Sequence, residues 1–144
     1  MGTQTMGQVR VKAKIENIED VLNVRAGKLK ADAVRFVEID DALVDTGAKF
    51  VSLPHSLIQR LGLYLVAKRQ ALTAAGLVPC NLYSTVWPTV NGRQCGVDVS
   101  EVPEDCPVLI GVLALEAMDF VVDPGKQRLI GNPAHGGENI IDLL

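Results

Sequence analysis

The stretch "DALVDTGAKFVSLP", residues 41–54, places an acidic residue between an apolar run and a turn. Ala42, Leu43 and Val44 are typical of a buried strand, and Asp45 follows them directly. Thr46 and Gly47 then favour a turn. A simple turn explains the three residues Asp-Thr-Gly when they are taken alone. The alternative is that the Asp45 carboxylate is catalytic. The other motifs of the chain are needed to choose between a turn residue and a catalytic residue.

Strand-like segments lie on both sides of this stretch. Residues 8–15, "QVRVKAKI", and residues 33–39, "AVRFVEI", alternate between apolar and polar side chains, which predicts half-buried strands. The polar connector over residues 16–32 indicates a loop or a short helical turn. Residues 49–53, "KFVSL", predict a further strand, and Pro54 opens one short helix that ends at Gly62.

The middle of the chain predicts two hairpins. Residues 63–72 and 77–90 favour strands joined by the small-residue tip "TAAG" at 73–76. Asn91-Gly92, a strong hairpin signal, leads into a strand over residues 93–102. After a turn at 103–107 come "VLIG" at 108–111, a second short helix within 112–118, and two short strands within 119–130.

These elements predict one mainly β domain, closed or barrel-like, with two short helices. We expect a tail at residues 1–7, the domain at 8–131, and a tail or dimer strand at 132–144. The chain has 144 residues, of which 48% are hydrophobic and 22% charged, which is enough for one core.

The charge and the rarer residues narrow the function. A net charge of -3 without basic clusters favours neither nucleic acid nor a membrane surface as a partner. No leader or long apolar run is visible, which favours a soluble, cytoplasmic protein. Met6 stands where a myristoylation signal requires Ser or Thr. Three cysteines and two histidines without metal-ligand spacing predict reduced structural thiols, and no metal or cofactor.

With "LVDTGA" at 43–48 and "VLIG" before a helix at 108–111, the chain resembles the retropepsin-like (retroviral-type, clan AA) aspartic proteases, as a bacterial single-domain member. The resemblance covers residues 8–130 and implies an acid-protease-like barrel. It implies that Asp45 is catalytic, that Thr46, Gly47 and Ala48 support its loop, and that Leu109, Ile110 and Gly111 thread beside it. The tip residues Thr73, Ala74, Ala75 and Gly76 correspond to the flap that closes over substrate.

Because the chain has one Asp-Thr-Gly triplet, the resemblance implies a homodimer in which Asp45 from each subunit forms the dyad. Two adjacent carboxylates share one proton, so one activates water while the other polarises the peptide carbonyl. We therefore expect an aspartic endopeptidase, a hydrolase without a cofactor, which grips an extended peptide. The alternative is a dimeric peptide-binding module of the same fold that cleaves weakly or not at all.

Two departures from viral members stand out. Viral enzymes pair an acidic residue after the triplet with an arginine after the second glycine, and here Lys49 and Val112 occupy those positions. The flap has one glycine where viral flaps have several. The other candidate side chains have structural explanations: strand-edge or turn carboxylates and core aromatics account for Asp40, Asp41, Asp98, Asp119, Asp123, Tyr83 and Trp87.

Overall fold

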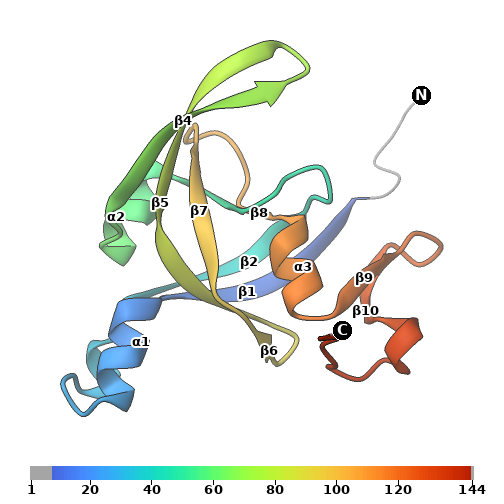
Figure 1. Cartoon of the computed structure of the whole chain (residues 1–144), viewed down its shortest axis with the longest axis horizontal. Coiled ribbons are helices and arrows are strands. Elements are labelled where there is room, and N and C mark those ends of the chain that lie inside the picture. The colour runs from blue at the N-terminus through green and yellow to red at the C-terminus, as the bar shows by residue number, and fades with distance from the viewer. Residues whose placement is uncertain (1–7, 144) are drawn as a thin grey trace.

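The computed structural model describes residues 8–143 and is mainly β, as predicted (Figure 1). The predicted tail at residues 1–7 lies outside the described residues, and so does Met6, on which the rejection of a myristoylation signal rests. Within the described part of the chain, none of the helices combines the length and the apolar character that a bilayer crossing requires.

The first strand, β1 (Val9–Asn17), follows its alternating sequence. Val9, Val11 and Ile15 are buried, and the charged residues between them face solvent. The connector that follows is more ordered than predicted, because it forms the helix α1 (Ile18–Arg25) and the 3-10 turn η1 (Ala31–Ala33). Asn17 caps α1 by accepting a hydrogen bond from the Asp20 backbone N–H at 3.3 Å. Residues 8–143 therefore contain three α-helices, and the prediction of two was wrong.

The opening stretch forms two strands and a helix. β2 (Phe36–Val44) ends one residue before Asp45, and β3 (Val51–Pro54) leads directly into α2 (His55–Leu61). Gly62 ends α2 in the left-handed conformation, as the sequence predicts. Residues 45–50 are the loop between β2 and β3, which we call the Asp45 loop.

The two hairpins form as predicted, with one correction. β4 (Leu65–Thr73) and β5 (Gly76–Val90) make a long hairpin that projects beyond the rest of the molecule (Figure 1). Asn91 and Gly92 turn with positive φ into β6 (Arg93–Gln94). The single strand predicted over 93–102 is wrong: it is interrupted at Cys95 and Gly96, after β6, and β7 (Val97–Val102) follows.

The main sheet returns on itself. Its strand order is β1-β2-β8-β3-β7-β5-β4, where β8 is the short strand Leu109–Ile110. The additional antiparallel pairing of β1 with β5 links the two ends of the path β1-β2-β8-β3-β7-β5. These six strands therefore form a ring, and the distal part of the β4–β5 hairpin extends from it.

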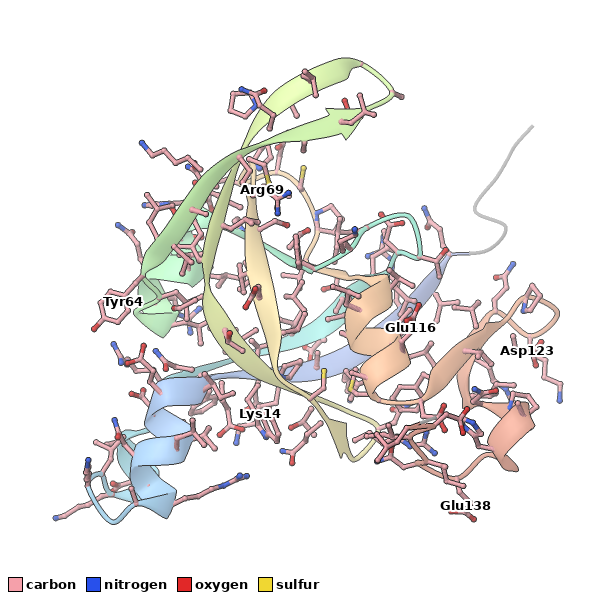
Figure 2. The ribbon with its side chains drawn as sticks, in the orientation of Figure 1. Lys14, Tyr64, Arg69, Glu116, Asp123 and Glu138 are labelled. Carbon is pink, nitrogen blue, oxygen red and sulfur yellow. The ribbon has the colours of Figure 1, made fainter. Side chains whose placement is uncertain are left out.

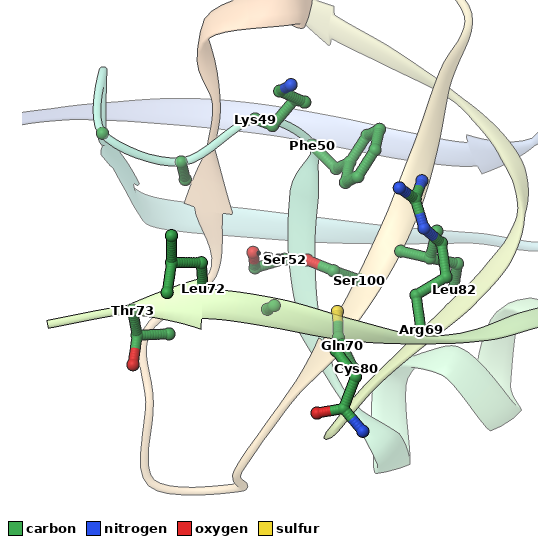
Figure 3. A pocket seen from close by; sticks show the side chains of 13 residues that line it. Lys49, Phe50, Ser52, Arg69, Gln70, Leu72, Thr73, Cys80, Leu82 and Ser100 are labelled. Carbon is green, nitrogen blue, oxygen red and sulfur yellow. Dashed lines mark hydrogen bonds between the residues drawn. The ribbon is translucent and has the colours of Figure 1, made fainter. Parts of the chain in front are cut away.

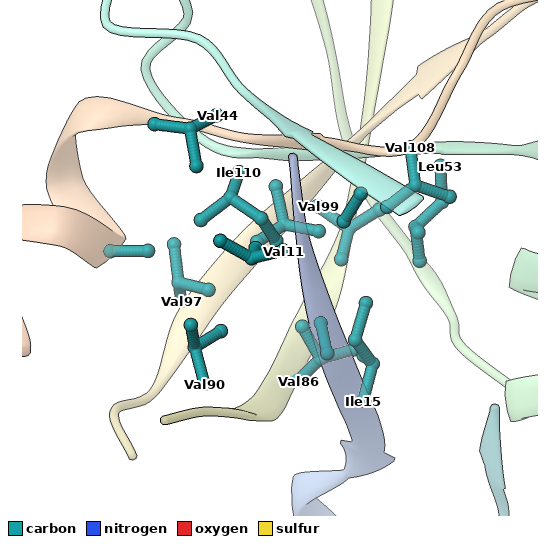
Figure 4. Packing of buried hydrophobic residues seen from close by; sticks show 14 of the residues in the cluster. Val11, Ile15, Val44, Leu53, Val86, Val90, Val97, Val99, Val108 and Ile110 are labelled. Atoms are coloured by element: carbon teal, nitrogen blue, oxygen red, sulfur yellow. The ribbon is translucent and has the colours of Figure 1, made fainter. Parts of the chain in front are cut away.

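The core lies inside this ring and is made mostly of β-branched residues. Figure 4 shows Val11 and Ile15 of β1 packed with Val86, Val97 and residues from the other strands. The remaining elements cover one end of the ring. They are α3 (Val112–Ala117), the antiparallel pair β9 (Phe120–Asp123) and β10 (Arg128–Gly131), and the 3-10 turn η2 (Pro133–His135).

Candidate functional site

The Asp45 loop is held by its own backbone and by β8. The Asp45 backbone N–H donates to the carbonyl of Ile110 at 3.0 Å, and the Asp45 carbonyl accepts from the N–H of Ala48 at 3.1 Å. The side-chain Oδ1 accepts a hydrogen bond from the Gly47 N–H at 2.9 Å. This bond fixes the carboxylate against its own turn, so Asp45 has a defined orientation before any ligand binds.

The second apolar-Gly segment threads beside the loop. β8 lies between β2 and β3, parallel to β2 and antiparallel to β3. The N–H of Val112 then donates to the Ala48 carbonyl at 2.8 Å, and that of Leu113 donates to the Lys49 carbonyl at 3.1 Å. Lys49 and Val112, which occupy the positions of an ion pair in viral members, therefore lie on two segments that are joined by backbone hydrogen bonds, each to the neighbour of the other.

Gly111 makes this close approach possible. A Cβ at this residue would lie 2.7 Å from the Ala48 carbonyl oxygen and closer still to that of Phe50. Real Cβ atoms do not approach backbone oxygens this closely, so the segment needs a glycine here. The structure thus brings Leu109, Ile110 and Gly111 directly behind the loop that carries Asp45.

The surroundings of the Asp45 carboxylate contrast with those of Asp20. Asp45 is half-buried, and no cationic side chain within residues 8–143 forms an ion pair with it. By contrast, Asp20 accepts two hydrogen bonds from the Arg35 guanidinium, at 2.8 and 2.9 Å, which outweigh burial and lower the pKa of Asp20. Asp20 is therefore a structural carboxylate, whereas the Asp45 side chain accepts only the Gly47 N–H within the described residues.

Thr46 and Gly47 are exposed. The hydroxyl of Thr46 makes no side-chain hydrogen bond within the described part of the chain. The brace expected from Thr46 is therefore not formed inside one chain and remains a prediction. The exposure of both residues leaves this side of the loop accessible to another molecule.

A cavity of about 530 Å³ opens between the Asp45 loop and the β4–β5 hairpin (Figure 3). At its back wall the hydroxyls of Ser52 and Ser100 are 2.9 Å apart. Three elements line the cavity: the Asp45 loop, the wall of the ring and the hairpin. The residues are Gly47, Ala48, Lys49, Phe50, Ser52, Ser100, Leu82, Cys80, Arg69, Gln70, Ala71, Leu72 and Thr73.

The predicted hairpin tip is only partly at the cavity. Thr73 lines it, whereas Ala74, Ala75 and Gly76 lie further out at the turn. The Thr73 hydroxyl accepts from the Ala75 N–H at 3.1 Å and donates to the Gly76 carbonyl at 2.9 Å, which stabilises the turn. The distal hairpin also exposes apolar side chains, with Leu72 82% and Leu77 67% exposed.

Several lining residues were not foreseen from the sequence. Phe50, Ser52 and Ser100 belong to strands or loops that have no recognisable motif, and Arg69 and Cys80 lie at mid-strand positions of the hairpin. The alternation along β4 was the available signal, since it places Arg69, Ala71 and Thr73 on one face. Which face meets the Asp45 loop depends on how the hairpin folds over.

The alternative candidates have the structural roles expected of them. Asp40 and Asp41 are exposed on β2, and the side chain of Asp123 accepts from the Gly125 N–H at 3.1 Å within a turn. The Tyr83 ring is buried and its hydroxyl donates to Glu101 at 2.7 Å, so this hydrogen bond and burial raise the pKa of Tyr83. Trp87 is half-buried beneath the guanidinium of Arg25.

Asp98 and Cys95 also lie apart from the cavity. Asp98 accepts from the Thr85 hydroxyl at 2.7 Å on the exposed face of the sheet. The three cysteines are free thiols, and burial raises the pKa of Cys95 to about 11. Cys95 is therefore a structural thiol.

The comparisons with known proteins leave the family open. No protein-family model matches this chain, and no curated protein matches it significantly.

Proposed function

We propose that this chain is an aspartic endopeptidase of the retropepsin-like type, in which Asp45 of two subunits forms the catalytic dyad. One observation carries the proposal: Gly111 lets β8 insert between β2 and β3, and the loop so braced carries the unpaired Asp45 carboxylate and lines a cavity through its residues 47–50. A simple turn would need neither the inserted strand nor the glycine contact. The arrangement therefore favours a catalytic role for Asp45 over that of a simple turn residue.

We further interpret the ring of six strands as an acid-protease-like closed barrel and the β4–β5 hairpin as its flap. The pairing of β1 with β5 supports the barrel. The projecting hairpin, with Thr73 at the cavity, supports the flap. A substrate peptide that enters beneath the hairpin in an extended conformation would form hydrogen bonds with the hairpin backbone, and the hairpin would shield it from water.

The chemistry follows from two carboxylates that meet. Adjacent carboxylates cannot both ionise easily, so one keeps the shared proton. The ionised Asp45 takes a proton from a water molecule as that water attacks the peptide carbonyl carbon. The protonated Asp45 gives its proton to the carbonyl oxygen, which yields a tetrahedral diol. The carboxyl group that took the proton from water then passes it to the amide nitrogen as the C–N bond breaks, and the other carboxylate takes the proton of one diol hydroxyl as the product carboxyl group forms. Each step uses only carboxyl groups and water.

A homodimer is required because one chain supplies one such carboxylate. The exposed Thr46 and Gly47 beside the half-buried Asp45 leave that face accessible to a partner. The tail at 132–144 remains a candidate dimer strand. In the single chain residues 139–143 form no strand, and the Ile140 N–H donates to Asp119 at 3.2 Å.

The test is cleavage of a denatured protein and of a peptide library between about pH 3 and 7, the range in which carboxylates are effective catalysts. We expect Asp45→Asn to lower the rate by about 10²–10⁴-fold, the usual contribution of a positioned acid or base. Asp41→Asn is the matched control, because Asp41 is exposed on the strand that leads to Asp45. Activity that survives Asp45→Asn would exclude the dyad.

The same experiment distinguishes the alternative, a dimeric peptide-binding module, by its result. Dimers that bind extended peptides, with no cleavage by the wild-type protein at any pH, would favour the module. A protein that stays monomeric at micromolar concentration and still cleaves would contradict both the dyad and the module.

A further inference from the structure

Arg69 lies on the side of the hairpin that faces the cavity. In the register of β4 with β5 it is directly opposite Cys80, and residues opposite each other in an antiparallel pair share a face. Both residues line the cavity. Figure 3 shows the Arg69 side chain beside Leu82 and directed toward Phe50, and Figure 2 shows Arg69 where the hairpin meets the body of the molecule.

The charged side chains that line the cavity are all cationic. Its charged lining residues are Arg69 and Lys49, and no Asp or Glu lines it. Within residues 8–143, neither cation forms an ion pair with a carboxylate. Because the whole chain has a net charge of -3, this positive charge is a local property of the cavity.

The surroundings strengthen the effect of that charge. Phe50 and Leu82 supply apolar walls beside the guanidinium, and apolar walls lower the local dielectric constant. A guanidinium offers a planar fork of N–H donors that fits a carboxylate in a bidentate way. The paired hydroxyls of Ser52 and Ser100 add polar groups at the back of the same cavity.

We propose that this cavity binds an acidic side chain, Asp or Glu, of the substrate peptide, with Arg69 as the specificity-determining residue. The proposal rests on the proposed function, since it names the substrate class of the same site. In a two-fold dimer the cavity occurs twice, once on each side of the dyad. The preferred peptides therefore have an acidic residue on either side of the bond to be cleaved.

Binding to the Asp45→Asn protein tests the proposal separately from cleavage. The probes are fluorescently labelled extended peptides in which one position at a time holds Glu, Gln or Lys and the others are randomised. We expect Glu peptides to bind about tenfold more tightly than Gln peptides at the preferred positions, as for a charge-assisted hydrogen-bonded pair. Lys peptides bind most weakly, because their charge repels that of Arg69.

Three variants of the Asp45→Asn protein assign the effect to the guanidinium. Arg69→Gln removes the preference for Glu, Arg69→Glu reverses it toward Lys, and Arg69→Lys keeps part of it because the charge remains without the fork. Lys68→Gln is the matched control: it removes one charge from the neighbouring residue, which does not line the cavity. It should leave the preference unchanged.

The outcomes separate the two proposals. Equal affinity for Glu and Gln peptides, or a Glu preference that survives Arg69→Gln, overturns the acidic-substrate proposal. If the Glu preference depends on Arg69 but the wild-type protein cleaves nothing, the cavity assignment stands and the endopeptidase proposal fails. If Lys68→Gln abolishes the preference as fully as Arg69→Gln, the effect comes from net charge and the assignment to Arg69 is wrong.

Discussion

Gly111 is the residue at which packing and the proposed chemistry depend on each other. Gly111→Ala would push a Cβ into the carbonyls of Ala48 and Phe50, which are backbone atoms of the Asp45 loop and cannot rotate away. We expect a loss of about 1–3 kcal/mol in the free energy of unfolding, as for an overpacked core. Chemical denaturation measures that loss. Cleavage activity should fall further than stability, because the loop that must move carries Asp45.

Gly96→Ala is the control for this prediction. A Cβ at Gly96 meets its neighbours at 3.5 Å or more, which is ordinary van der Waals contact, and its φ is not positive. This variant should keep both stability and activity. If Gly111→Ala behaves like Gly96→Ala, β8 does not brace the Asp45 loop as described.

At this scale the sequence revealed the residues of the loop, but of the residues that line the cavity it revealed only Gly47, Ala48 and Thr73. Asp45 and Gly111 could be identified because each stands in a short motif whose spacing has a physical reason. Arg69 has no such motif, and the alternation of β4 says only that it shares a face with Ala71 and Thr73. The fold of the hairpin over the ring, a long-range packing event, decides that this face lines the cavity.

The element that follows β9 and β10 is held by an Asp-His-Asp cluster. Nδ1 of His135 lies 2.8 Å from Asp119, and Nε2 lies 2.8 Å from Asp142 in the tail. Asn132 and the Ile140 N–H also donate to Asp119, and Arg93 donates to its backbone carbonyl. Only a protonated imidazole can donate to both carboxylates at once.

This geometry predicts a tail whose attachment depends on pH. Hydrogen bonds to Asp119 and Asp142 raise the pKa of His135 in the folded protein. The stabilisation is therefore fully present below about pH 6.5, the ordinary pKa of histidine, and is lost as the pH rises through the higher folded value. Burial opposes ionisation of Asp119, but hydrogen bonds from His135, Ile140 and Asn132 prevail and lower its pKa. That contribution is lost only in acid, as the pH falls below about 3.9.

An NMR titration of the imidazole resonances measures this directly, with His135→Gln to assign the signal. We expect a His135 midpoint above that of a free histidine, and a melting temperature that falls between about pH 6 and 8 in the wild type more than in His135→Gln. Asp142→Asn should lower the midpoint. A midpoint at or below the free value, or equal pH slopes in the two proteins, would show that the imidazole does not attach the tail.

Among the elements, the ones with strong local signals were predicted best. β1, α2 and the Asn91-Gly92 turn follow from alternation, an αL glycine and positive φ, which are local properties. α1 was missed as a defined helix because its apolar pattern is weak and its start depends on the Asn17 cap. The split between β6 and β7 was missed because burial still alternates across it, with Cys95 and Val97 inside and Gly96 exposed, so the pattern gives no sign of the break.

At the scale of the whole molecule, closure of the ring is the feature that local sequence describes least. Alternation predicts that β1 and β5 are strands, but not that they pair across 68 or more intervening residues, from Lys14 opposite Thr89 to Asn17 opposite Val86. The likeness to a known family supplied the order of strand, flap and second glycine, and hence an expectation of closure. It also supplied the expectation of a dimer, in which each chain would contribute one of the two carboxylates of the proposed dyad.

A mixing experiment tests that dimer through its catalytic consequence. If each active site needs Asp45 from both subunits, mixing wild-type protein with Asp45→Asn protein at constant total concentration leaves only wild-type pairs active. After the subunits have exchanged, activity should fall with the square of the wild-type fraction, because the probability that two random partners are both intact is the product of their fractions. A site contained in one chain would instead lose activity in proportion to the fraction itself. The Asp41→Asn protein, mixed in the same way, controls for exchange and dilution, and should leave the activity constant. A linear decline with Asp45→Asn would mean that the carboxylate beside the cavity works alone, and the dyad would have to be abandoned even if the protein cleaves peptides.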